Sequence, residues 1–172
     1  MVYFKTLKNM NLPKTVSSLA TIRFQDCDPF NHLNNASYIN YFMNHREDQL
    51  IKVYNLDIYE MARKLGKSWV SNSNQIAYIK PAFLMEKVII ESQLIAFDKS
   101  NLKVEMRMYN ADKTHLKAII WCGFTHFNLL KQQKEVHTEE FLELFNSILN
   151  PIEESEFEKR ISRLRLHKRA IV

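Results

Sequence analysis

The sequence contains only two glycines, Gly66 and Gly123, among its 172 residues. Nucleotide-dependent enzymes hold phosphate on loops with several closely spaced glycines, because only glycine lets the backbone approach a phosphate so closely. Neither a Walker loop nor a dinucleotide-binding fingerprint can be built from two glycines so far apart. The scarcity of glycine therefore excludes both of these nucleotide-binding classes.

Cysteines and long apolar runs are also scarce. Cys27 and Cys122 lie far apart in the sequence, so neither a disulfide framework nor a cysteine-based zinc site is expected. No segment reaches the roughly 20 apolar residues of a membrane helix, and residues 1–14 lack the apolar core of a signal peptide. We therefore expect an unprocessed cytoplasmic protein without a membrane span or a metal site.

Acidic residues are missing from one end of the chain. After residue 158 the sequence has six basic residues and no acidic one: Lys159, Arg160, Arg163, Arg165, Lys168 and Arg169. Residues 1–158 consequently carry 18 basic and 19 acidic side chains, which is close to neutral. A basic helix can attract nucleic acid or an anionic membrane. A solvated helix end is the commoner origin of such a cluster, and we expect no nucleic-acid partner.

Hydrophobic spacing predicts the order of helices and strands. Residues 18–28 begin with β-compatible side chains and end in polar ones, which predicts a strand leading into a loop. Residues 36–55 have apolar side chains at helical spacing, and Asn34 or Asn35 precedes them as a candidate N-cap. Four segments rich in Ile, Val and aromatic residues then predict antiparallel strands, at 75–83, 86–97, 101–110 and 117–129.

The third of these segments alternates strictly between two kinds of side chain. Apolar Val104, Met106 and Met108 alternate with charged Lys103, Glu105 and Arg107. Such alternation predicts a strand that is covered on one face only. One long helix followed by an antiparallel meander predicts an α+β fold in which the sheet wraps the helix.

Two further helices are predicted near the C-terminus. Thr138 can cap a helix that extends to residue 149, with Glu139 and Glu140 favourably placed in its first turn. Asn150 and the proline after it begin a last helix over residues 151–169. Its narrow apolar stripe would dock it on the rest of the protein, through Phe157, Ile161 and Leu164. We expect residues 1–150 to form one domain and residues 151–172 a basic helical extension.

Polar side chains crowd into residues 26–38, DCDPFNHLNNASY, between the first strand and the long helix. Aspartate and asparagine are ordinary turn and cap residues, so turn chemistry alone could explain them. The segment also resembles hotdog-fold thioesterases of the 4-hydroxybenzoyl-CoA type, whose pattern is D-x-D-x-x-G-H-x-N-N-x-x-Y. The matching residues are Asp26, Asp28, His32, Asn34, Asn35 and Tyr38. The resemblance covers about residues 17–149 and departs at Asn31, which replaces the family glycine but tolerates a positive φ.

The resemblance implies a hotdog fold and an acyl-CoA thioesterase of lipid metabolism, with an acyl-carrier protein as the alternative thiol carrier. It places the catalytic carboxylate on Asp28, acting as nucleophile or general base, and oxyanion donors on the first N–H groups of the helix after Asn35. His32, Asn34, Asn35 and Tyr38 would support the site. Coenzyme A is part of the substrate, so no separate cofactor is expected. In the family the helix end and the aspartate come from different subunits, which implies a homodimer or a dimer of dimers.

Several assignments within this segment stay open. His32 either orients the substrate or only hydrogen-bonds the loop, and Tyr38 is expected to pack under the loop. Asp26 is the rival of Asp28, and only the register of the pattern decides between them. Cys27 lies between two carboxylates that should keep its thiol protonated, and Ser37 lacks the glycine-flanked elbow of a serine hydrolase.

Other assignments concern the substrate and the activity itself. Met43 and Phe42 are candidate walls of an acyl pocket, and four cations are candidates for the CoA phosphates: Lys80, Lys87, Lys103 and Arg107. Residues 28–32, DPFNH, superficially echo the aspartate and histidine of hotdog hydratases, although the order of residues differs. The main alternative is a non-catalytic dimer that binds acyl thioesters or a partner protein.

Overall fold

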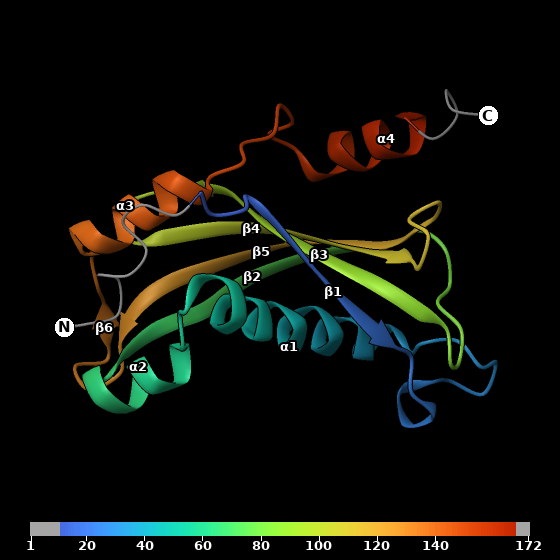
Figure 1. Ribbon diagram of the computed structural model, residues 1–172, viewed down its shortest axis with the longest axis horizontal. Helices are drawn as coiled ribbons and strands as arrows, with labels where there is room; N and C mark the ends of the chain where they lie inside the picture. Colours follow the sequence, from blue (N-terminus) through green and yellow to red (C-terminus); the bar gives the residue numbers. More distant parts are fainter. Residues whose placement is uncertain (1–10, 168–172) are drawn as a thin grey trace.

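The structure is a computed structural model that describes residues 11–167. In this range the strands form one antiparallel sheet in the order β1-β3-β4-β5-β2, with β6 paired to β5 (Figure 1). Their bounds are β1 Thr15–Thr21, β2 Lys67–Tyr78, β3 Lys87–Phe97, β4 Asn101–Asn110, β5 Leu116–Asn128 and β6 Gln133–Lys134. Strands β1 and β2 are therefore the two ends of the main strand order.

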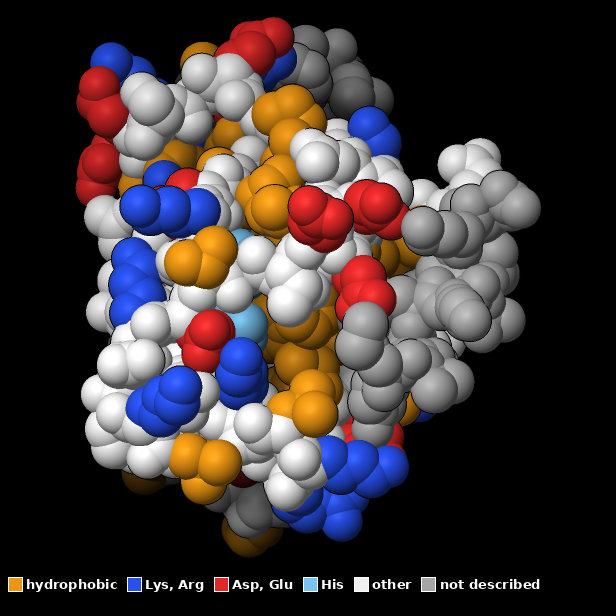
Figure 2. All heavy atoms as spheres, turned by 90° about the vertical axis from the view of Figure 1, so that its left-hand side faces the viewer, with side chains coloured by type: hydrophobic (Ala, Val, Ile, Leu, Met, Phe, Trp, Pro, Cys, Tyr) orange, Lys and Arg blue, Asp and Glu red, His pale blue; other side chains and the backbone are white. Residues whose placement is uncertain are grey.

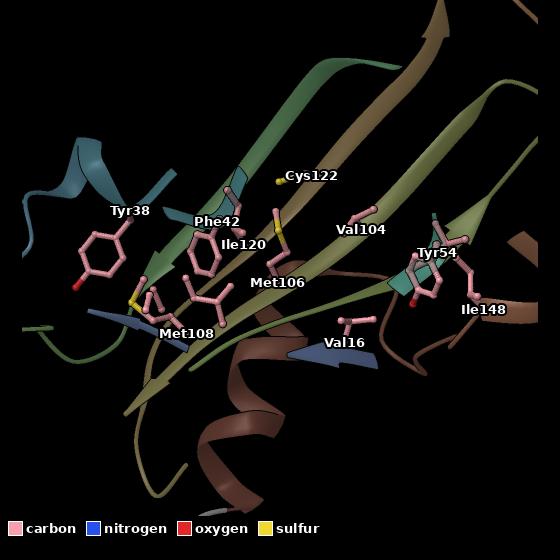
Figure 3. Packing of buried hydrophobic residues seen from close by; sticks show 14 of the residues in the cluster. Val16, Tyr38, Phe42, Tyr54, Val104, Met106, Met108, Ile120, Cys122 and Ile148 are labelled. Atoms are coloured by element: carbon pink, nitrogen blue, oxygen red, sulfur yellow. The ribbon is translucent and has the colours of Figure 1, made fainter. Parts of the chain in front are cut away.

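The predicted long helix is α1, Asn35–Tyr54, and it lies along one face of the sheet (Figure 1). Four of its buried side chains recur every three or four residues, which is the period of one helix face: Tyr38, Phe42, Arg46 and Gln49. Tyr38, Phe42 and Tyr54 point from this face towards the sheet (Figure 3). The helix ends at Asn55, which adopts the left-handed conformation with φ of 49°.

Strand β4 supplies much of the surface on which α1 packs. Val104, Met106 and Met108 are all less than 2% exposed and belong to the same cluster as Phe42 (Figure 3). Burying a side chain of this size stabilises the fold by about 1.5–3 kcal/mol. The alternation in the sequence therefore assigns the inner face of β4 correctly.

The prediction that the other face of β4 is open is wrong. Helix α4, Phe157–His167, covers that outer face, and α1 lies on the opposite side of the sheet (Figure 1). Phe157 packs there with Ile119 and Trp121, and Ile161 and Leu164 pack against the same cluster, as their spacing predicts. Charged Glu105 also lies under α4, and it is tolerated there because Arg160 pairs with it.

The start of α4 also differs from the prediction. Residues 151–156 are not helical, because the chain first continues along the sheet: Asn150 donates its N–H to Leu94 O at 2.9 Å. The Asn150 side chain donates to Gln93 Oε1 at 2.8 Å instead of capping a helix. The helix before it, α3 Glu139–Ile148, is capped by Thr138 as predicted. Lys168 and Arg169 of the predicted basic end lie outside the described residues.

The N-terminal half contains one helix that the sequence reasoning missed. Helix α2, Ile58–Leu65, follows α1, and β2 begins directly after it, eight residues before the predicted strand start at residue 75. Strand β1 ends at Thr21 rather than continuing to residue 28, and residues Phe24–Asp26 form a single 3-10 turn. Residues 27–34 of the polar segment are therefore a loop, and its residues 35–38 form the first turn of α1.

Candidate functional site

The polar segment folds back on itself in front of α1. Asp28 N donates to His32 O at 2.8 Å, so that residues 27 and 33 face each other as an isolated β-bridge. Asn34 N donates to Asp26 O at 2.9 Å. These bonds hold the loop with both aspartates against the N-terminus of α1.

Asn31 makes this reversal possible. Its φ is 62°, in the left-handed region that glycine adopts freely and asparagine better than most other residues. Its carbonyl accepts a hydrogen bond from Leu84 N at 2.9 Å, which ties the loop to the segment before β3. The turn expected at the family glycine is therefore formed here by asparagine.

The Asp28 carboxylate is fixed by backbone donors. Its Oδ1 accepts hydrogen bonds from Phe30 N at 2.9 Å and from His32 N at 3.0 Å. Both bonds set the direction of the carboxylate. Oδ2 accepts no hydrogen bond from the part of the chain that the structure describes. Asp28 is half-buried, so one oxygen of a well-oriented carboxylate stays available to a ligand.

The Asp26 carboxylate is occupied differently. Tyr41 of α1 donates its hydroxyl to Asp26 Oδ2 at 2.9 Å and accepts from Arg23 N at 3.0 Å. Burial, with the nearby Asp26 carboxylate adding to it, raises the pKa of Tyr41 to about 12, so the phenol stays a donor. Asp26 thus anchors the loop to α1, and the two aspartates have different surroundings. Tyr41 was missed because it lies outside the recognised pattern.

The first turn of α1 has fewer free donors than a bare helix end. Asn34 caps the helix, since its Oδ1 accepts from Ala36 N at 3.0 Å, and Ser37 N donates to Asn34 O at 2.9 Å. In residues 11–167, the N–H group of Asn35 has no acceptor. Tyr78 of β2, also missed in the sequence, donates its hydroxyl to Asn35 O at 2.9 Å. The donor left for a ligand at this end is therefore the Asn35 N–H, at the positive end of the helix dipole.

The remaining predicted side chains line the loop. The His32 ring packs edge-on against Phe83, with 5.0 Å between the ring centroids. The backbone N–H of His32 donates to Asp28 Oδ1. Tyr38 is 2% exposed, and its hydroxyl accepts from Ala82 N at 3.1 Å. The pKa of the Cys27 thiol is raised, by burial and then by the charges of Asp26 and Asp28, so this cysteine stays protonated as predicted.

The four candidate cations divide into two pairs. Lys103 Nζ sits 3.7 Å from the centroid of the Trp121 ring, and Arg107 pairs with Glu91 at 3.0 Å. Both cations therefore have partners on the outer face of the sheet, the face opposite α1. Lys80 and Lys87 are exposed. Lys80 lies in the connection before β3, whose Ala82 O accepts from Leu33 N of the loop at 2.8 Å.

An apolar cavity of about 360 Å³ lies between α1 and the sheet. Its walls run from Ile39 and Met43 of α1 to Phe145 and Ile148 of α3, with Phe124 of β5 between them. This volume is at the lower end of the range for small-molecule sites. At the end of the molecule formed by α2, α3 and β6, apolar side chains show in a hollow among charged ones (Figure 2). Met43 is a wall residue as predicted, whereas Phe42 is fully buried in the core instead.

Two features that would indicate other functions are absent from the described residues. Among residues 11–167, no group of three or more His, Cys, Asp or Glu side chains is placed to hold a metal ion. Within the same range, no helix is both long and apolar enough to cross a membrane.

Comparison with known proteins gives a family and a fold. Residues 22–145 match the model of the thioesterase-like superfamily, and a search of curated proteins gives no match. A hypothetical protein of Staphylococcus aureus, solved in complex with CoA, superposes with a TM-score of 0.74 at 14% identity over 86% of this chain and 94% of that one. A 1,4-dihydroxy-2-naphthoyl-CoA thioesterase from Synechocystis gives 0.69 at 11% identity over 78% and 95%.

A third similar structure is a probable thioesterase from Escherichia coli, with a TM-score of 0.66 at 21% identity over 78% of this chain and 98% of that one. At such low identities these likenesses establish the fold. The predicted α+β hotdog architecture is confirmed, and the family match covers the loop with both aspartates.

Proposed function

Because the chain belongs to the thioesterase-like superfamily, we propose that it hydrolyses an acyl thioester to a free acid and a thiol, with Asp28 as the catalytic carboxylate. The observation that supports the proposal is the pattern of hydrogen bonds to the Asp28 carboxylate. Two backbone N–H groups hold one carboxylate oxygen and leave the other available, directly in front of α1. An apolar cavity suited to an acyl group lies along the same helix.

In the proposed reaction the thioester carbonyl lies between the Asp28 carboxylate of one protomer and the N-terminus of α1 of its partner, which is the arrangement that the family resemblance implies. Asp28 attacks the carbonyl carbon, or takes a proton from a water that does so. Negative charge then develops on the carbonyl oxygen, where the Asn35 N–H and the helix dipole stabilise it. When the intermediate collapses, the carbon–sulfur bond breaks and the sulfur leaves as the thiol. If a water attacked, its oxygen is already in the acid product and the proton that Asp28 took passes to the sulfur. If Asp28 attacked, the collapse leaves an acyl anhydride on Asp28, and a water then hydrolyses this anhydride, supplying the oxygen of the acid and the proton of the thiol.

The neighbouring residues have supporting roles in this proposal. Asn34 caps α1 and so fixes the position of the Asn35 N–H. His32 holds Asp28 through its backbone, and its ring, packed on Phe83, forms one side of the loop. Tyr38 packs beneath the loop and accepts from Ala82 N. Asp26 acts through Tyr41 as an anchor, which makes it a positioning residue.

We propose coenzyme A as the thiol carrier, with an acyl-carrier protein as the alternative. A protein of this fold has been solved with CoA, which supports the choice. Lys80 is the favoured cation for the CoA phosphates, because it is exposed and its segment is hydrogen-bonded to the polar loop. Such a role places the protein in lipid metabolism, and the free thiols of Cys27 and Cys122 suit the reducing cytoplasm.

We further propose that the protein works as a homodimer, or as a dimer of dimers. Strand β2 is at the edge of the sheet, and its residues 71–75 are all exposed. An edge strand offers unpaired N–H and C=O groups to a second chain. Pairing of β2 with its copy would extend the sheet across two protomers. Light scattering coupled to size-exclusion chromatography tests this, and a monomer at micromolar concentration would contradict it.

The test of the proposed activity compares Asp28→Asn with Asp26→Asn. Free-thiol release is measured from acyl-CoAs of short, medium, long and aromatic type. Asp28→Asn should reduce kcat by at least about 100-fold and leave the unfolding midpoint unchanged, because asparagine keeps the shape but loses the base. Asp26→Asn should lower the midpoint and retain measurable turnover.

Two results would contradict the proposal. Equal activity of Asp28→Asn and the unmutated protein would remove Asp28 from the mechanism. No turnover of any CoA or carrier-protein thioester by the folded protein would favour the non-catalytic binding alternative instead.

A further inference from the structure

The apolar cavity contains a buried cation, Arg46 of α1. Arg46 is 7% exposed and lines the cavity among predominantly apolar side chains. Its Nη1 donates to Ser92 Oγ at 3.1 Å, and the Tyr54 hydroxyl is a second hydrogen-bond partner. A guanidinium carries five N–H donors. Within the described residues, these two neutral oxygens therefore account for only two of its five donors, and the guanidinium borders the apolar cavity.

Within residues 11–167, no counter-ion accompanies this cation. Of the ion pairs with N···O within 4.0 Å in the described residues, none includes Arg46. The nearest acid in sequence, Glu47, also lines the cavity but accepts its hydrogen bond from the Tyr59 hydroxyl. A buried charge that is neither paired nor fully hydrogen-bonded is costly.

The other buried charges in the part of the chain that the structure describes are paired. Lys117 binds Glu86 at 2.7 Å, and Glu105 binds Arg160 at 2.8 Å. Arg46 is the exception among them, and it faces the cavity. A ligand that brings an anionic group into the cavity would complete its hydrogen bonds.

The position of Arg46 on α1 relates it to the proposed chemistry. It follows Asn35 by 11 positions, which corresponds to about 16 Å along the helix axis at 1.5 Å per residue. Ile39 and Met43 lie between them on the same helix face and are walls of the cavity. An acyl chain that starts at the Asn35 N–H and follows this face therefore meets apolar side chains first and the guanidinium afterwards.

We propose that the cavity selects acyl groups that carry a second carboxylate at the far end of the chain, and that Arg46 binds this carboxylate. The inference rests on the proposed thioesterase function and specifies its substrate class, the thioesters of dicarboxylic acids. A planar guanidinium matches a carboxylate with two parallel hydrogen bonds. A chain that ends in a methyl group fills the same apolar wall but leaves Arg46 without a counter-ion.

The test compares thioesters that differ only at the far end. Sebacoyl-CoA, its methyl ester and decanoyl-CoA share one chain length, and only the first has a free terminal carboxylate. We expect kcat/KM for sebacoyl-CoA to exceed the other two by about 10- to 100-fold, the usual effect of hydrogen bonds to a charged group. Equal values for sebacoyl-CoA and its methyl ester, or a preference for decanoyl-CoA, would overturn the inference. This comparison uses the unmutated protein and does not depend on how a variant folds.

Variants then assign the preference to Arg46. Arg46→Met should abolish it, whereas Lys52→Met, which removes an exposed cation of the same helix, should leave it intact. Retention of the preference by a folded Arg46→Met protein would remove Arg46 from the proposal.

A binding measurement separates failure of this inference from failure of the proposed function. If no thioester is hydrolysed, the proposed function fails, and calorimetry on the unmutated protein still compares sebacoyl-CoA with its methyl ester. Binding of sebacoyl-CoA at least about 10-fold more tightly would uphold the carboxylate site without turnover. Equal affinities, or binding of neither, would overturn it.

Discussion

Helix α4 is held on the sheet by a buried ion pair, and replacing Arg160 by methionine measures what this pair contributes. Glu105 is fully buried and accepts from Arg160 Nε at 2.8 Å and from Arg160 Nη2 at 3.0 Å. The Glu105 carboxylate also accepts hydrogen bonds from Trp121 Nε1 at 2.9 Å and from Gln93 Nε2 at 3.1 Å. Methionine keeps the length of the arginine stem and removes its charge, so the substitution leaves the Glu105 carboxylate buried with two neutral donors.

Breaking a buried ion pair by removing one partner typically costs about 3–5 kcal/mol. Arg107 moderates this cost, because its Nε lies 3.6 Å from Glu105 Oε1 and has no hydrogen-bond partner of its own among the described residues. A small shift would let Arg107 donate to the orphaned carboxylate. We therefore expect the lower end of the range, about 3 kcal/mol, and a melting temperature lower by about 6–12 °C.

Urea denaturation followed by circular dichroism gives the free energy of unfolding. The control is Arg163→Met, which removes a neighbouring cation that is 41% exposed and pairs with Glu153 and Glu154. Exposed pairs contribute about 0.2–1 kcal/mol, so this variant should stay close to the unmutated protein. If Arg160→Met lost no more stability than Arg163→Met, the buried pair would not be what holds α4.

Three further perturbations test the core, the loop and the effect of pH. Phe42→Ala should lower the free energy of unfolding by about 3–5 kcal/mol in urea, because it empties a fully buried site under α1; a loss below about 1 kcal/mol would contradict the packing described. Asn31→Ala should lower the melting temperature and Asn31→Gly should not, since φ is 62° at this position; the opposite order would refute the left-handed turn. Burial lowers the pKa of His126 and of His137 from the ordinary value of 6.5, so the unfolded chain takes up protons first as the pH falls. The free energy of unfolding should therefore decrease as the pH falls from about 7 to 5. This decrease should be smaller in His137→Gln than in His115→Gln, which changes an exposed histidine. Equal decreases in the two variants would show that His137 does not cause the pH dependence.

Local signals in the sequence account for the parts of the fold that were predicted. Helix α1 has an asparagine cap, and from Tyr38 to Gln49 a buried residue recurs every three or four positions, so both signals are local in the sequence. Helix α2 carries similar signals that were overlooked, since Asp57 caps it through Tyr59 N and Glu60 N and Gly66 ends it at φ of 62°. Its eight residues are too few for periodicity to show clearly.

The parts that were not predicted depend on contacts between distant residues. The sequence predicts a solvent-exposed outer face of β4 because Glu105 is charged. The burial of Glu105 is tolerated because its carboxylate binds the guanidinium of Arg160, which lies 55 positions later in the sequence. Arg46 poses the same difficulty in the candidate site, since an arginine within an amphipathic helix normally faces water. Periodicity does place Arg46 on the face of Ile39 and Met43, but only the cavity shows that this face encloses a ligand-sized space.

The two aspartates of the loop illustrate what the pattern could and could not decide. In the sequence Asp26 and Asp28 are equivalent carboxylates, and the register of a resemblance alone favours the second. In the structure the Asp26 carboxylate accepts a hydrogen bond from the hydroxyl of Tyr41, nearly two turns into α1, whereas Asp28 accepts from two backbone N–H groups of its own loop. A side chain partner ties Asp26 to the position of the helix, so a change there disturbs the loop. Backbone partners orient Asp28 and leave its second oxygen available, which is the arrangement that a general base or nucleophile requires. The two carboxylates therefore have different settings: Asp26 fixes the loop against the helix, and Asp28 has the free oxygen that the proposed reaction requires.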